Sequence, residues 1–120
     1  MQVKEYIMSK VKLKIKLNEY EDIIDGIFIN NKIKFLLDKK LVTISINDNN
    51  IIMKRKHNDN EYTYICFDKI NPEAYYFYNN KYPLNIKVIN IKKNNNIIEV
   101  KYKIENDIFE FKLEYEGSEL

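Results

Sequence analysis

The sequence predicts an all-β protein: a single antiparallel β-barrel, closed on itself, with about eight or nine strands. Three observations lead to this prediction. Apolar and polar side chains alternate over most of the chain, which is the period of a half-buried strand and not of a helix. The segments between these runs are mostly short, so neighbouring strands are expected to be antiparallel. A long meander of this kind avoids exposed edges most simply by closing.

The length and composition indicate one soluble domain. A chain of 120 residues can bury roughly 65% of its unfolded surface without needing a staple. We expect the barrel at residues 11–115, after an N-terminal segment at 1–10 and before a frayed tail at 116–120. No apolar run at the start is long enough for a signal peptide or a membrane span, and the single cysteine cannot form an internal disulfide. These features predict a cytoplasmic protein that does not bind membranes.

The first strands are read from alternation and from turn residues. Residues 11–17 alternate strictly, with apolar side chains on one face and lysines on the other. The polar stretch 18–22 is a break, and residues 20–24 fit either a helix or a continuing strand. Gly26 indicates a bulge or bend in the next strand. Asn30 and Asn31 tolerate positive φ, which predicts a tight turn before a strand at 33–37.

The clearest hairpin lies at residues 42–55, where two alternating runs are joined by Asn and Asp. Its turn is either a two-residue primed turn at residues 48–49 or a four-residue loop at 47–50. Both turns place Ile46 opposite Ile51.

Counting outward from that pair predicts the rest of the hairpin register. Ile44 then faces Met53, and Val42 faces Arg55, all on the apolar face, while Thr43 and its neighbours lie on the other face. Arg55 is the only arginine of the chain and stands at the end of this apolar face.

The second half of the chain continues the meander. A turn is expected at His57–Asn60, and Pro83 marks an edge strand or a strand start, because proline cannot donate to a ladder. A slip of the inward phase within residues 84–91 indicates a β-bulge. A two-residue turn at Asn106-Asp107 would set Ile104 opposite Phe109. The remaining strands are expected at residues 61–67, 74–78, 98–104 and 109–115, and loops at 68–73 and 93–96.

The pattern resembles a bacterial family of small calycin-type (lipocalin-like) barrels, the YwiB-like proteins. The residues that carry the resemblance are Asp25-Gly26, Thr43-Ile44-Ser45-Ile46, Arg55, Phe67, Tyr75–Tyr78, Tyr82, and the alternating runs Ile98–Ile104 and Phe109–Tyr115. They cover about residues 11–115. The resemblance implies a calycin-like barrel, and it implies no activity, because the family has none assigned.

No catalytic or metal site is predicted, and no cofactor. His57 is expected in a solvated turn, and Cys66 is expected to pack as a small buried hydrophobe. The cysteine and histidine content fits no zinc site, and two glycines cannot form a phosphate-binding loop. The carboxylates between Glu19 and Asp25 lack the alternating pattern of a calcium loop. We therefore interpret the chain as a binding module and not as an enzyme.

Arg55 is the main candidate for ligand binding. On the apolar face it either reaches water or an acidic partner at the barrel end, or caps the barrel mouth and binds a carboxylate or phosphate. Tyrosine hydroxyls would assist it, and the candidates are Tyr62, Tyr64, Tyr76 and Tyr102. The ligand would be small and anionic or amphipathic, and the barrel interior is expected to be mostly filled.

Two other functions stay open, an oligonucleotide-binding module and a structural or protein-interaction domain that could form a homodimer. Tyr62, Tyr64, Tyr75, Tyr76 and Tyr78 could stack on bases, but base stacking needs a basic groove alongside. The segment 68–78 contains only one lysine, and the net charge is +2, so the sequence argues against nucleic acid. An elongated basic and aromatic surface would favour the first alternative, and an exposed apolar patch the second.

Overall fold

The computed structural model describes residues 9–117, and this range forms eleven β-strands without a helix. The strands are β1 (Ser9–Leu17), β2 (Tyr20–Ile29), β3 (Lys32–Leu37), β4 (Lys40–Ile46), β5 (Ile51–Asn58), β6 (Glu61–Phe67), β7 (Glu73–Tyr78), β8 (Asn80–Leu84), β9 (Ile86–Lys93), β10 (Ile97–Ile104) and β11 (Asp107–Gly117). Most of the expected N-terminal segment at 1–10 and of the frayed tail at 116–120 lies outside the described residues. The described part has no helix that could cross a membrane.

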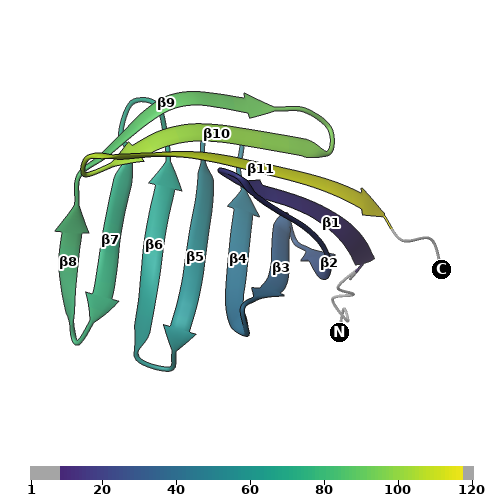
Figure 1. The fold of residues 1–120 in the computed structure, drawn as a ribbon, viewed down its shortest axis with the longest axis horizontal. Coiled ribbons are helices and arrows are strands. Elements are labelled where there is room, and N and C mark those ends of the chain that lie inside the picture. Colours follow the sequence, from purple (N-terminus) through teal and green to yellow (C-terminus); the bar gives the residue numbers. More distant parts are fainter. Residues whose placement is uncertain (1–8, 118–120) are drawn as a thin grey trace, which may run out of the picture.

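All strands belong to one antiparallel sheet, in the order β8-β7-β6-β5-β4-β3-β2-β1-β11-β10-β9. The sheet curls so that β9, β10, β11 and β1 cross over the row formed by β3 to β8 (Figure 1). The two edge strands, β8 and β9, follow each other in the chain and meet at Asn85, although no ladder joins them within residues 9–117. The predicted all-β barrel is therefore confirmed as a nearly closed barrel.

The strand number differs from the expected eight or nine. Asn85 separates β8 from β9, where the sequence pattern suggested one strand start. Its main-chain N–H donates to the Glu105 carboxylate at 3.0 Å, and the Glu105 N–H donates to the Asn85 carbonyl at 2.9 Å. This pair of hydrogen bonds fixes a corner at which the chain passes from one layer to the other.

The core lies between the two layers of the barrel. Phe67 of β6 contacts Tyr102 of β10 with ring centroids 4.7 Å apart, and Phe28 of β2 stacks on Tyr115 of β11 at 5.7 Å. The most completely buried side chains come from seven strands and are Phe67, Leu13, Ile15, Ile33, Ile44, Ile51, Ile98 and Leu113. Alternation along each strand therefore directs one apolar row inward, as predicted.

The register of the central hairpin is confirmed. Ile46 pairs with Ile51, Ile44 with Met53, and Val42 with Arg55. Ile44 is fully buried, whereas Met53 is only partly buried. The turn is not a primed one, because neither of its central residues, 48 and 49, has positive φ. Instead the Asn47 N–H donates to the Asn50 carbonyl at 3.0 Å, and the two amide side chains also hydrogen-bond.

Gly26 marks a close approach and not a bulge. It pairs with Val11 on one side and Phe35 on the other, without a shift in register. A Cβ atom at Gly26 would lie 2.5 Å from Leu13 Cδ1 and 3.1 Å from the Lys34 carbonyl oxygen. The open question of residues 20–24 is answered by β2, which begins at Tyr20 and is extended throughout.

The turns show where asparagine does and does not specify register. Asn30 and Asn31 have φ of 51° and 61°, as their tight turn requires. The expected Asn106-Asp107 turn is wrong: the turn is Glu105-Asn106, with Glu105 at φ 54°, and Tyr102 faces Phe109. Because the shift is two residues, Phe109 still points inward.

Two expected edge features are present. Pro83 lies on the edge strand β8, which pairs only with β7 within the described sheet, and edge strands are where proline is tolerated. The bulge in β9 is at Ile89, which is 41% exposed, while Val88 and Ile91 on either side pack against the core. Both features discourage the pairing of an edge strand with another chain.

Candidate functional site

The candidate site is a cavity of about 220 Å³ at the end of the barrel where β5 turns into β6. Most of its walls are apolar, and the polar exceptions come from β5, β6 and β10. We call it the Arg55 cavity. Its lining residues are Ile15, Leu17, Phe35, Leu37, Val42, Met53, Arg55, His57, Thr63, Ile65, Tyr102, Ile104, Phe109 and Phe111. This volume is below the roughly 300–1,000 Å³ of drug-sized sites, so the interior is mostly filled, as predicted.

Arg55 lies in the cavity wall because it continues the inward row of β5. It pairs with Val42 on one side and Thr63 on the other. Its Nε atom is buried and has no hydrogen-bond partner. The ion pairs formed within residues 9–117 do not include Arg55. A buried donor without an acceptor is rare in folded proteins, because leaving it unpaired costs about 1–3 kcal/mol.

His57 is the second polar group, and the expectation that it lies in a solvated turn is wrong. Strand β5 runs to Asn58, and the register shifts between Lys56 and Asn58, so His57 is the extra residue of a bulge. Its side chain is half-buried, and Nε2 lies 2.8 Å from Thr63 Oγ1. The imidazole lines the same cavity as Arg55, because His57 follows Arg55 by two residues and so lies on the same face of β5.

The positive charges of Lys40 and Arg55 beside His57 favour the binding of an anion in the Arg55 cavity. Burial lowers the pKa of His57, and the positive charges of Lys40 and Arg55 lower it further, while the Glu61 carboxylate partly opposes them. Glu61 is itself engaged, because it accepts a hydrogen bond from Tyr76. The cavity therefore has a guanidinium with a free buried donor beside an imidazole that tends to stay neutral.

The structure separates the tyrosines that the sequence grouped with Arg55. Tyr102 lines the cavity, and burial raises its pKa to about 12. Tyr76 lies beside the mouth, its ring 6.1 Å from that of His57. Tyr62 and Tyr64 lie on the outer face of β6, away from Arg55.

Sequence reasoning missed His57 and Thr63 as members of the site. The signal available was position: His57 stands two residues after Arg55, on the same face of β5. The bulge at His57, which makes β5 longer than expected, left no mark in the residue pattern.

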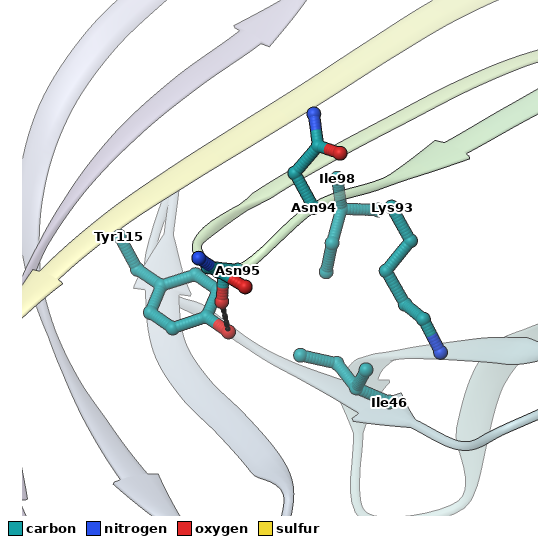
Figure 2. A pocket seen from close by; sticks show the side chains of 6 residues that line it. All are labelled: Ile46, Lys93, Asn94, Asn95, Ile98 and Tyr115. Atoms are coloured by element: carbon teal, nitrogen blue, oxygen red, sulfur yellow. Dashed lines mark hydrogen bonds between the residues drawn. The ribbon is translucent and has the colours of Figure 1, made fainter.

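A second hollow lies at the opposite end of the barrel, where the β4–β5 and β9–β10 turns meet (Figure 2). It measures about 590 Å³ and is lined by Ile46, Lys93, Asn94, Asn95, Ile98 and Tyr115. Tyr115 donates its hydroxyl hydrogen to the Asn95 carbonyl at 2.9 Å, and Lys93 Nζ donates to the Asn47 carbonyl at 2.8 Å. Tyr115 and Lys93 therefore already have partners in the protein, and the buried side-chain atom without a partner in the described residues is Arg55 Nε, which makes this hollow a weaker candidate than the Arg55 cavity.

Other potential chemistry has a structural explanation. Cys66 is a buried free thiol, as predicted, and burial raises its pKa. Two acidic residues of β2 pair across the ladder, with Asp25 2.6 Å from Lys12 and Glu21 3.6 Å from Lys14, and Asp22 accepts hydrogen bonds from the Tyr20 hydroxyl and the Ile23 N–H. Within the described range no three His, Cys, Asp or Glu side chains gather as metal ligands would.

Comparison with known proteins supports the fold and goes no further. No family model and no curated protein matches the chain. Among solved structures, the crystal structure of the ywiB protein from Bacillus subtilis is similar, with a TM-score of 0.59 over 95% of this chain and 92% of that chain. Sequence identity is 16%, so the similarity shows a YwiB-like fold.

Proposed function

We propose that this protein is a non-enzymatic binding protein that holds a small anionic, amphipathic ligand in the Arg55 cavity. One observation carries the proposal: the buried Nε of Arg55 has no partner in the wall of a largely apolar cavity. The planar guanidinium suits a carboxylate or phosphate, and such a ligand would supply the missing acceptor. The apolar walls would then cover the body of the ligand.

The cavity volume limits the size of the ligand. At about 220 Å³ the cavity is larger than a 150 Å³ cavity that accommodates benzene and smaller than most drug-sized sites. Aromatic walls at Phe35, Tyr102, Phe109 and Phe111 favour a flat or flexible apolar group. We therefore propose monocyclic aromatic acids and short-chain fatty acids as the ligand class.

The same residues support catalysis less well than ligand binding. Thr63 and His57 form a hydroxyl and imidazole pair, but a nucleophile and base also need a third group that orients the base. Among residues 9–117, Thr63 is the one side chain that forms a hydrogen bond with His57. We assign this pair to positioning a ligand head group. We also propose a cytoplasmic location, which the free thiol of Cys66 supports. A relationship to calycin-type barrels is proposed as well, and the interior cavity of the barrel supports it.

Calorimetric titration tests the proposal. Phenylacetate and hexanoate should bind the wild-type protein, and their neutral amides should bind at least tenfold more weakly, since they lack the charge that Arg55 recognises. Arg55→Met should abolish binding while folding stays normal, and Arg55→Lys should retain part of it. Lys54→Met is the matched control, because Lys54 is the adjacent residue on the outer face, and it should bind like wild type. Equal binding of acids and amides, or no binding of either, would contradict the proposal.

A dimer through the outer face of β2 to β4 is the second candidate. Ile23, Leu36 and Leu41 are 65%, 63% and 39% exposed there, and a hollow of about 750 Å³ runs beside the last two. Exposed apolar patches often mark interfaces. Sedimentation equilibrium distinguishes the cases: a dimer that Leu36→Lys converts to a monomer supports this interface, and a wild-type monomer at every concentration contradicts it.

A further inference from the structure

The outer face of strands β3 to β8 combines aromatic rings with lysines, although the sequence does not show them together. Tyr62, Tyr64, Tyr75 and Phe77 form the aromatic part, and each ring is half-buried. The lysines come from the neighbouring strands, and we call the whole set the basic-aromatic face. Its members are Lys34, Lys54, Lys56, Tyr62, Tyr64, Tyr75, Phe77 and Lys81.

The strand registers arrange these residues in two rows across the sheet. One row runs from Lys34 through Thr43 and Lys54 to Tyr64 and Tyr75. The neighbouring row runs Leu41, Lys56, Tyr62, Phe77 and Lys81. Strands lie about 4.8 Å apart, so from β3 to β8 the face extends about 24 Å. This is long enough to follow several nucleotides of an extended strand.

The rings stack in pairs, and a lysine nitrogen lies over the face of one ring in each pair. Tyr64 stacks on Tyr75 with centroids 4.8 Å apart, and Tyr62 stacks on Phe77 at 5.0 Å. Lys54 Nζ lies 4.3 Å from the Tyr62 centroid, and Lys81 Nζ lies 4.3 Å from that of Tyr75. Lysines that could bind phosphates therefore lie beside aromatic rings that could stack on bases.

In each layer some lysines have an acidic partner and others do not. On the other layer Lys101 lies 3.5 Å from Glu110, and Lys112 lies 3.4 Å from Glu99. On the basic-aromatic face Lys56 lies 3.5 Å from Asp59, whereas the ion pairs within residues 9–117 include neither Lys34 nor Lys54. Glu73 is the one carboxylate among the outward positions of β3 to β8, and it pairs with Lys81 at 3.2 Å. The face as a whole is complementary to a polyanion.

We propose that the basic-aromatic face binds single-stranded RNA. Stacking of bases on aromatic side chains beside a positively charged track is how single strands are held without sequence readout. The face also carries the hydroxyls of Thr43, Tyr62 and Tyr75, which can exchange hydrogen bonds with the ribose 2′-hydroxyl. The sequence argued against nucleic acid because residues 68–78 contain one lysine, but strands β3, β5 and β8 supply the charge.

Fluorescence anisotropy with a labelled 12-nucleotide oligouridylate tests the proposal and is independent of the Arg55 cavity. The Kd should be about 10⁻⁴–10⁻⁶ M at physiological salt, and binding should be tighter at low salt and weaker at high salt. The double variant Lys34→Gln/Lys54→Gln should weaken binding at least tenfold. Lys14→Gln/Lys112→Gln removes the same charge from the other layer and should change binding less than twofold. Equal losses in both double variants, or no binding by the wild type, would overturn the proposal.

The contribution of the rings is tested separately. Tyr64→Leu/Tyr75→Leu keeps apolar area but removes the stacked pair, and it should weaken RNA binding at least tenfold. Tyr20→Leu, at an exposed tyrosine of β2, is the control, and melting curves verify that each variant folds. Three results would overturn the assignment: unchanged affinity of the Tyr64/Tyr75 variant, displacement of RNA by polyphosphate at equal phosphate concentration, or equal affinity for oligothymidylate.

Discussion

His57 Nε2 lies 2.8 Å from Thr63 Oγ1, across the bulge that ends the β5–β6 ladder. This contact holds the imidazole at the mouth of the Arg55 cavity, where burial and two positive charges lower its pKa. A ligand with a negative head group would change that balance, because it would add a favourable charge beside His57.

The first prediction is that His57 titrates below the ordinary value of about 6.5. It is the only histidine of the chain, so its ring resonances are assigned by composition in an NMR titration. Arg55→Met should raise this pKa toward the ordinary value, since one of the lowering charges is removed. A wild-type pKa above 6.5 would show that the imidazole is not in the environment described here.

The second prediction concerns stability in mild acid. Because the folded state holds the His57 proton less readily than the unfolded chain, the stability from neutral His57 is complete above about pH 6.5. It is lost as the pH falls through that value toward the lower pKa of the folded state. Urea unfolding should show a decrease between about pH 7 and pH 5 that His57→Gln reduces. An identical decrease in the variant would exclude His57 as its source.

The third prediction uses the close packing of Gly26 on Leu13. Gly26→Ala places a methyl group 2.5 Å from Leu13 Cδ1, so the core must shift and stability should fall by about 1–3 kcal/mol. Gly117→Ala is the control, because no heavy atom lies within 4 Å of a Cβ there. Denaturant unfolding of both variants measures the difference, and equal effects would contradict the contact.

The fourth prediction tests the hairpin register. Ile44→Ala should destabilise the protein by about 2–5 kcal/mol, because Ile44 is fully buried. Thr43→Ala, one residue away on the outer face, should change stability by about 0.5 kcal/mol or less. A slip of the strand by one residue would reverse this order.

How far the sequence predicts this protein depends on which interactions are local. Alternation fixes which side chains of a strand point inward, so the register of Ile46 with Ile51 followed from the residues alone. The turn at Glu105-Asn106 depends on hydrogen bonds to Asn85, which is far away in the chain. The sequence pattern therefore predicts a strand register that differs by two residues from the observed one. Hydrogen bonds between distant segments leave no trace in local patterning.

The same distinction applies to the sites. Arg55 was identified because its position on the apolar face is a property of one hairpin. The bulge that brings His57 to Thr63 depends on β6, and the basic-aromatic face depends on lysines from β3, β5 and β8. Neither assembly could be derived before the strand order was known.

Binding of an anion by Arg55 can be observed directly at the Arg55 Nε–H group during a ligand titration. Since Arg55 is the only arginine, the Nε–H region of an NMR spectrum contains one arginine resonance, which needs no mutational assignment. We expect phenylacetate or hexanoate to shift this resonance saturably, with the same midpoint as the methyl groups of Ile15 and Ile65 in the cavity wall. An Nε–H resonance that stays unchanged while a carboxylate binds, or that moves with a midpoint different from those methyl groups, would contradict anion binding by Arg55.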